Sequence, residues 1–200
     1  AARLHARLVE RTLATVVAAR CGAVELHCAP NARHAFFRML ARRYRVRLRS
    51  QARGDLGERM RRALSRALRE SEAVVLIGAD CPALRPVDLR RATRLLHSGS
   101  EGVFAPTEDG GYALIGLRRV SAQLFSGIEW GSATVMAETR KRLRRLAWRW
   151  RELRTLWDVD RPADFLRLKR FTLPPLSSAV RRGARRSAGS RARWDGSRRT

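Results

Sequence analysis

The chain of 200 residues has very little lysine, few cysteines and no long apolar run. Of its 43 basic residues only Lys141 and Lys169 are lysines, and 18 acidic residues oppose them. This skew toward arginine is typical of codon usage in a GC-rich genome, and the arginines are spread along the chain instead of forming one basic stripe. The net charge of +25 still predicts nonspecific attraction to nucleic acid and phosphates.

The three cysteines share no spacing that is typical of a metal or redox site. They indicate reduced, mostly buried thiols in a cytoplasmic protein. The alternative for Cys81, which follows Asp80, is a nucleophile, but no histidine lies near it in the sequence. No apolar run approaches the roughly 18 residues of a membrane span. Residues 1–20 indicate an amphipathic helix with charges throughout, so neither a span nor a signal peptide is expected.

Helical and extended patterns alternate around the most apolar stretch, residues 73–77, which is typical of a strand buried on both faces. Helices are expected at 1–20, 32–43 (capped by Asn31), 56–70, 86–97, 132–146 and 162–170, and strands at 23–29, 46–48, 73–79, 103–106, 112–117 and 148–157. This alternation predicts an α/β layer fold with a mainly parallel sheet. The composition then changes to proline, serine and arginine, which predicts a domain at 1–170 and a disordered basic tail at 171–200.

Acidic residues follow three of the expected strands, and they are Asp80, Glu108, Asp109, Asp158 and Asp160. Carboxylates gathered at one edge of a sheet form a site for a hard cation, Mg²⁺ or Mn²⁺, which would bridge to a diphosphate. In an extended segment Asp158 and Asp160 project to the same side. The alternative for Asp80 and Asp160 is that each caps the helix that follows it.

Two glycine-rich loops each allow a structural and a functional interpretation. Gly54 and Gly57 flank Asp55, which can cap a helix, while the same helix start can receive a phosphate with help from Arg59. The run 107–111 is first a hairpin signal. Its functional alternative is that two glycines let the backbone approach a ligand while Asp109 points at it.

Five segments in order, 54–60, 77–84, 109–117, 124–132 and 156–164, resemble the bacterial family of uncharacterised glycosyltransferase-A-like proteins, in the nucleotide-diphospho-sugar transferase superfamily. The resemblance covers roughly residues 1–170. It implies a Rossmann-like, three-layer GT-A fold with a mixed, mostly parallel sheet. Relatives begin with a hydrophobic strand and a loop containing Gly, Lys and Arg that cradles phosphates. This chain starts within the following helix, so we expect an N-terminally truncated domain.

The resemblance also implies roles for individual residues. A divalent metal would be bound by Asp80 together with Asp158 or Asp160. The nucleotide would lie near Gly54, Asp55, Gly57 and Arg59, and the sugar or acceptor pocket would be bordered by Gly110, Gly111, Tyr112 and Trp130. Asp109 is the candidate catalytic base, because it should face the pocket and could accept a proton from an acceptor hydroxyl.

These features predict a metal-dependent transferase that uses a nucleotide-activated donor. The expected reaction moves a sugar from a nucleotide-diphospho-sugar to an acceptor that the sequence does not identify. A nucleotidyltransferase that releases pyrophosphate is the alternative, since the fold supports both chemistries. Two further alternatives are an inactive truncated remnant and a nonspecific nucleic-acid binder that acts through the basic tail.

Overall fold

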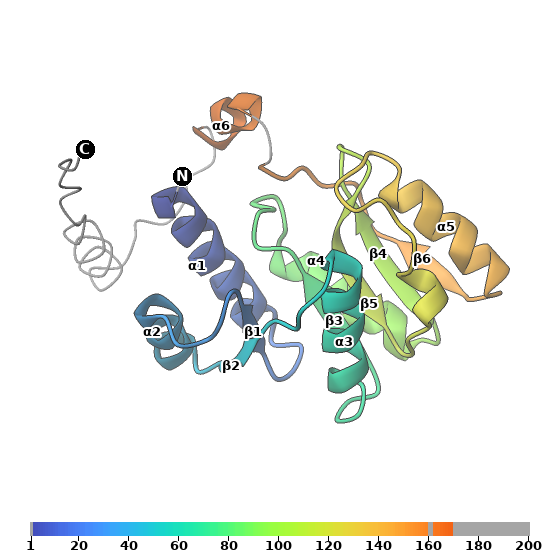
Figure 1. The fold of residues 1–200 in the computed structure, drawn as a ribbon, viewed down its shortest axis with the longest axis horizontal. Coiled ribbons are helices and arrows are strands. Elements are labelled where there is room, and N and C mark those ends of the chain that lie inside the picture. The colour runs from blue at the N-terminus through green and yellow to red at the C-terminus, as the bar shows by residue number, and fades with distance from the viewer. Residues whose placement is uncertain (1, 160–161, 170–200) are drawn as a thin grey trace, which may run out of the picture.

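The computed structural model describes residues 2–159 and 162–169, and its helices and strands alternate as the sequence predicts (Figure 1). The helices are α1 (Ala2–Ala19), α2 (Ala35–Tyr44), α3 (Leu56–Ala67), α4 (Pro86–His97), α5 (Val135–Arg145) and α6 (Pro162–Lys169), with a 3-10 helix η1 (Ala122–Leu124). The strands are β1 (Glu25–Cys28), β2 (Arg47–Ser50), β3 (Val74–Ile77), β4 (Gly102–Pro106), β5 (Tyr112–Leu117) and β6 (Trp150–Glu152). The α/β class is confirmed, and the expected tail at 171–200 lies outside the described residues.

The strands form two sheets within the described residues. β1 pairs in parallel with β2, and the larger sheet has the order β3-β5-β4-β6. The turn at 107–111 reverses the chain, and β5 then inserts between β3 and β4, antiparallel to both. β3 and β4 therefore run in the same direction, and β6 is parallel to β4. The mixed, mostly parallel sheet is confirmed: among the described strands of the larger sheet, β3, β4 and β6 run in one direction and β5 runs against them.

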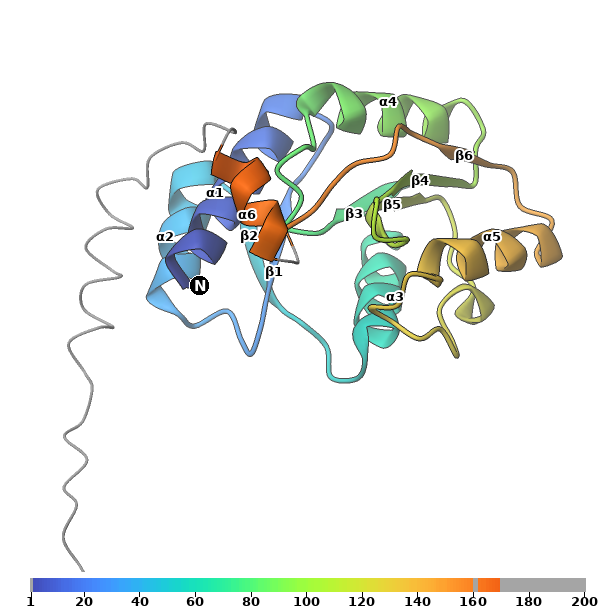
Figure 2. The same cartoon turned by 90° about the horizontal axis from the view of Figure 1, so that it is seen from above.

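The larger sheet is the middle of three layers, because its strands bury side chains on both faces. Val103 and Leu114 belong to a core cluster with α4, whereas Phe104 and Ile115 belong to a second cluster with α3 and α5. Figure 2 shows α4 on one side of this sheet and α3 and α5 on the other. The three-layer, Rossmann-like arrangement is thus confirmed.

Helix α1 joins the small sheet to the large one. Its Val9 and Leu13 pack in a third cluster with α2 and the small sheet, while its Leu8 belongs to the cluster on the α4 side. The Thr12 hydroxyl donates to the carbonyl oxygen of Ala79, just beyond β3, at 3.4 Å. Within the described residues β1 and β3 each pair with a single strand.

Local hydrogen bonds decide where α2 begins, and the expected Asn31 cap is wrong. The side chain of Asn31 accepts from the amide of Arg33 at 2.8 Å and forms a turn before the helix. The cap is His34, whose Nδ1 accepts from the amide of Phe36 at 3.2 Å.

Among the described helices, none combines the length and the apolar character that a membrane span requires.

Candidate functional site

Asp80 lies directly beyond the carboxyl end of β3, as expected. The amide of Gly78 donates to the carbonyl of Ala113 at 3.1 Å and continues the pairing with β5 by one residue. A Cβ atom at Gly78 would lie 2.6 Å from Oδ1 of Asp80, so the carboxylate of Asp80 folds back over the end of the strand. Asp80 is exposed, and its carboxylate is therefore accessible to a ligand.

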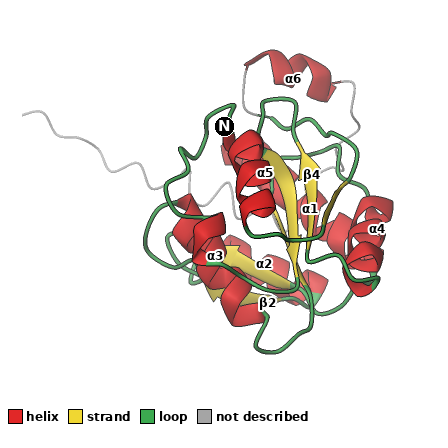
Figure 3. Ribbon diagram, turned by 90° about the vertical axis from the view of Figure 1, so that its right-hand side faces the viewer, coloured by secondary structure: helices red, strands yellow, loops and turns green. Residues whose placement is uncertain are grey.

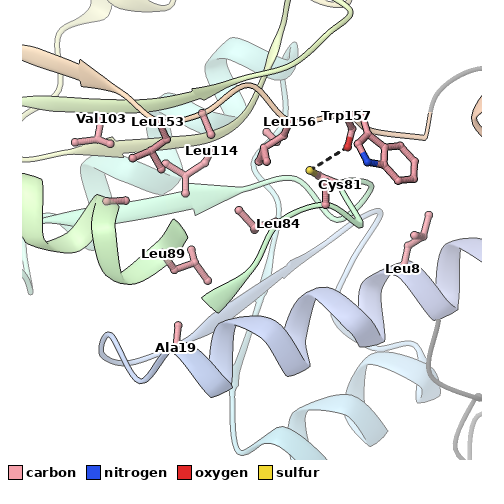
Figure 4. Close-up of a cluster of buried hydrophobic side chains, with 14 of the residues drawn as sticks. Leu8, Ala19, Cys81, Leu84, Leu89, Val103, Leu114, Leu153, Leu156 and Trp157 are labelled. Atoms are coloured by element: carbon pink, nitrogen blue, oxygen red, sulfur yellow. Dashed lines mark hydrogen bonds between the residues drawn. The ribbon is translucent and has the colours of Figure 1, made fainter. Parts of the chain in front are cut away.

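The segment after β6 brings Asp158 to the same place. The amide of Val159 donates to the carbonyl of Asp80 at 3.1 Å, and the thiol of Cys81 donates to the carbonyl of Trp157 at 3.2 Å (Figure 4). These two bonds flank Asp158 on both sides along the chain. The structure thus places two of the three predicted metal ligands side by side, and Asp160 lies outside the described residues.

Burial beside these carboxylates decides the chemistry of Cys81. Burial, and with it the charges of Asp158 and Asp80, raises the pKa of the Cys81 thiol to about 12. A thiol with such a pKa is protonated at neutral pH and is a poor nucleophile. The structure therefore supports the buried, hydrogen-bonding role of Cys81 over the nucleophilic one.

The donor set at Asp80 and Asp158 fits a hard cation. Mg²⁺ and Mn²⁺ prefer carboxylate oxygens and are commonly bound by one or two carboxylates together with water and substrate phosphates. Within residues 2–159 and 162–169, no group of three or more His, Cys, Asp or Glu side chains is placed to hold a metal. A cation here would depend on oxygen ligands beyond these two side chains, as a diphosphate supplies.

Asp109 and Gly110 organise the turn between β4 and β5. Oδ1 of Asp109 accepts from the amide of Gly111 at 3.0 Å and from the hydroxyl of Thr107. Gly110 has a φ of +93°, and a Cβ there would lie 2.0 Å from the carbonyl oxygen of Ala133. The hairpin interpretation of 107–111 is confirmed, and a role of Asp109 as base stays a prediction.

The turn adjoins the segment that carries Asp158. Thr107 forms a parallel bridge with Leu156, and the amide of Glu108 donates to the carbonyl of Leu156 at 3.0 Å. Asp80, Glu108, Asp109 and Asp158 therefore belong to one edge of the sheet, at the carboxyl ends of β3 and β4 and beyond β6. This is the edge at which open α/β sheets bind ligands.

The start of α3 carries the predicted nucleotide residues, and their hydrogen bonds are local. Oδ1 of Asp55 accepts from the amide of Glu58 at 2.8 Å and caps the helix, after Gly54 with a φ of +114°. Nη1 of Arg59 donates to Oε1 of Gln51 at 2.9 Å, and its Nε donates to the carbonyl of Asp55 at 3.3 Å. The cap is confirmed, whereas contact of these residues with a nucleotide stays a prediction.

Trp130 joins the predicted nucleotide segment to the predicted substrate pocket. A Cβ at Gly57 would lie 2.5 Å from Nε1 of Trp130, so the indole packs directly on the backbone of α3. On its other side Trp130 meets Tyr112 edge-on, at 6.5 Å between ring centroids. Nε1 of Trp130 is buried without a hydrogen-bond partner within the described part of the chain. The sequence suggested these residues separately, and the fold brings them together.

An ion pair that the sequence did not predict, between exposed Arg154 and buried Asp88, ties the loop after Asp80 to the segment before Asp158. Arg154 donates from Nε to Oδ1 of Asp88 at 3.1 Å and from Nη2 to Oδ2 at 2.8 Å. Nη2 also donates to the carbonyl of Ala83 at 2.8 Å, and Asp88 accepts from the amide of Arg85 at 2.9 Å. A carboxylate three residues after the N-cap residue, here Arg85, is a capping signal, and it could have marked Asp88.

Comparison with protein families matches residues 12–132 to the model described as "Uncharacterized protein conserved in bacteria (DUF2064)". Among solved structures, a proposed nucleotide-diphospho-sugar transferase from Desulfovibrio desulfuricans G20 is 26% identical, with a TM-score of 0.74 over 94% of this chain and 83% of that chain. The fold also matches CMP:2-keto-3-deoxy-manno-octonic acid synthetase complexed with CTP, at 11% identity and a TM-score of 0.57 over 82% and 86% of the two chains.

A third structure, glucosyl-3-phosphoglycerate synthase from Mycobacterium tuberculosis in complex with Mn²⁺ and uridine-diphosphate-glucose, is 15% identical. The match covers 84% of this chain and 76% of that chain, and its TM-score is 0.49. No curated protein matches the chain. The family match spans more than half of the 200 residues and includes β3, Asp80 and the turn at Asp109. The chain belongs to the DUF2064 family of uncharacterised bacterial proteins.

Proposed function

We propose that this protein is a glycosyltransferase that uses a nucleotide-diphospho-sugar as donor and a divalent cation, Mg²⁺ or Mn²⁺, held by Asp80 and Asp158. The observation that carries the proposal is that Asp80 and Asp158 lie on adjacent segments, joined by hydrogen bonds, at the carboxyl edge of the sheet. The likeness to a proposed nucleotide-diphospho-sugar transferase supports it, because that likeness extends over nearly the whole chain.

The proposed chemistry follows from the groups at this edge. A bound cation supplies Lewis acidity that offsets the negative charge developing on a diphosphate leaving group. Asp80 and Asp158 hold the cation, and the backbone bonds around them fix their spacing. The start of α3, with Gly54, Gly57 and Arg59, offers backbone amides and a cation to the nucleotide. Tyr112 and Trp130 supply an aromatic wall, and Asp109 is the proposed base for the acceptor hydroxyl.

Nucleotidyl transfer is the second candidate. The likeness of the fold to a synthetase that binds CTP favours it, although at 11% identity that likeness concerns the fold alone. The two reactions differ in their products. Glycosyl transfer releases a nucleoside diphosphate, whereas nucleotidyl transfer from a nucleoside triphosphate releases pyrophosphate. Incubation of the chain with Mn²⁺, a panel of nucleotide-sugars or nucleoside triphosphates, and candidate acceptors therefore distinguishes them.

The metal site is tested by calorimetric titration of Mn²⁺ into the wild-type chain, Asp80→Asn and Glu138→Gln. Loss of an outer-shell partner alone weakens metal binding by 10–100-fold, so removal of one direct carboxylate is expected to weaken it at least about tenfold. Glu138 lies on α5, pairs with Lys141 and serves as a matched carboxylate control that should bind Mn²⁺ like the wild type. Equal Mn²⁺ affinity in all three proteins would remove Asp80 from the metal site.

A further inference from the structure

Arg167, on α6, presents its guanidinium at the same edge of the sheet. Its Nη1 lies 2.7 Å from Oε2 of Glu108, and its Nη2 lies 3.1 Å from Oε1, so both arms of the fork engage one carboxylate. Its Cζ atom lies 4.6 Å from the centre of the Trp157 ring. Figure 3 shows α6 beyond one end of the strands of the large sheet. An arginine from the last described helix thus reaches the residue that precedes Asp158.

The two residues that hold Arg167 are themselves held in place. Trp157 is 6% exposed, and its carbonyl accepts from the thiol of Cys81. The amide of Glu108 donates to the carbonyl of Leu156 at 3.0 Å. The guanidinium therefore packs on a buried indole whose neighbour in the chain is Asp158, one of the two proposed metal ligands.

The ion pair between Arg167 and Glu108 is exposed enough for another anion to replace the carboxylate. Their side chains are 46% and 55% exposed, and ion pairs as exposed as this contribute little to stability. Other arginines near this edge are engaged differently: Arg11 donates to the carbonyl of Pro82, and Arg154 donates to Ala83 and to buried Asp88. The carboxylate of Glu108 is thus a half-exposed partner of Arg167, and an anion of the same shape can replace it.

The charge at the proposed metal site calls for such a cation. The two carboxylates of Asp80 and Asp158 balance the charge of one divalent ion, so that ion by itself does not neutralise a diphosphate. A guanidinium fork matches the oxygen spacing of phosphate as well as that of carboxylate, and it binds both with two parallel hydrogen bonds.

We infer that Arg167 binds the diphosphate of the donor, and that Glu108 holds this guanidinium until the diphosphate replaces it. The inference rests on the proposed function, because it places the diphosphate beside the cation of Asp80 and Asp158. It adds a substrate-binding residue from α6, outside the segments that carry the family resemblance's nucleotide and metal residues. It also assigns Glu108 a competing role, so that removal of its charge should favour the ligand.

The test is calorimetric titration of inorganic pyrophosphate, in saturating Mn²⁺, into the full chain and four variants. Arg167→Gln is expected to weaken binding about tenfold or more, and Arg167→Lys should fall between this variant and the wild type, since it keeps the charge without the fork. Glu108→Gln is expected to tighten binding about 1.5- to 5-fold. Arg140→Gln is the control, because Arg140 makes a similar two-armed bond to Glu152 between α5 and β6.

The outcomes separate this inference from the proposed function. Wild-type affinity in Arg167→Gln, or weaker binding in Glu108→Gln, overturns the role of Arg167 while the metal site stands. Titration of Mn²⁺ alone should give the same affinity in Arg167→Gln as in the wild type, and a loss there would make Arg167 a structural support of the metal site instead. No binding of pyrophosphate by the wild-type chain would overturn the proposed function together with this inference.

Discussion

The ion pair between Arg154 and Asp88 is expected to hold the two proposed metal ligands in register, and Arg154→Gln is the perturbation that tests it. Arg154 donates three hydrogen bonds, two to the carboxylate of Asp88 and one to the carbonyl of Ala83. The side chain of Asp88 is only 9% exposed, so it cannot replace the lost partner with water, whereas Arg154 is 40% exposed. We expect Arg154→Gln to reduce the free energy of unfolding by about 2 kcal/mol.

A second ion pair of the same form provides the control. Arg140 bonds Glu152 with both arms at 2.8 Å, and Arg140 and Arg154 have similar exposure. The side chain of Glu152 is 28% exposed and remains hydrated when its partner is removed. Arg140→Gln is therefore expected to cost about 0.5 kcal/mol or less in urea unfolding. Equal losses in the two variants would refute the argument from burial.

The pH dependence of unfolding gives a second readout. Burial raises the pKa of the Asp88 carboxyl, but the hydrogen bonds from Arg154 and from the amide of Arg85 outweigh burial and hold the pKa below its usual value of 3.8. Because the folded-state pKa is the lower one, this stabilisation is present above the unfolded-state pKa and is lost as the pH falls through the folded-state value. In Arg154→Gln the free energy of unfolding should therefore fall less steeply as the pH is lowered. In Arg140→Gln the contribution of Asp88 to this pH dependence should remain.

The functional consequence separates positioning from stability. Arg154→Gln loosens the tie between the loop after Asp80 and the segment before Asp158, so we expect weaker Mn²⁺ binding even where the variant is fully folded. Arg154→Lys keeps the charge but not the fork, and it should restore Mn²⁺ affinity only in part. Unchanged Mn²⁺ affinity in a folded Arg154→Gln protein would limit the pair to a structural role.

Three further predictions follow from the site geometry. Gly110→Ala should cost at least about 2 kcal/mol more in urea unfolding than Gly131→Ala, because both positions have a similar positive φ but only at Gly110 would a Cβ collide with a backbone carbonyl; equal costs would contradict this. Asp55→Ala should cost about 1 kcal/mol through loss of the α3 cap, and Asp55→Asn should recover most of it. Native chain treated with iodoacetamide at pH 8 should label the exposed Cys21 and not the buried Cys81, whose pKa is about 12, as peptide mapping by mass spectrometry would show.

Much of the fold was predictable because it depends on local patterns. The apolar run at 73–77 predicted β3, and Asp55 after Gly54 predicted the cap of α3. The cap of α2 was not predictable in the same way, because Asn31 and His34 both carry acceptors and only the path of the chain decides between them. The position of β5 also escaped the pattern: the turn at 107–111 predicted a hairpin, but alternation of elements does not reveal that β5 inserts between β3 and β4.

By itself the sequence determined the element types, the acidic residues at strand ends and the glycines that the turns require, because each depends on residues close together in the chain. Only the tertiary structure decided which of these residues meet. It placed Asp158 beside Asp80, packed Trp130 on Gly57 and set Arg167 between Glu108 and Trp157. Such contacts depend on strand order and on how separate segments pack, and neither follows from the periodicity of any one segment.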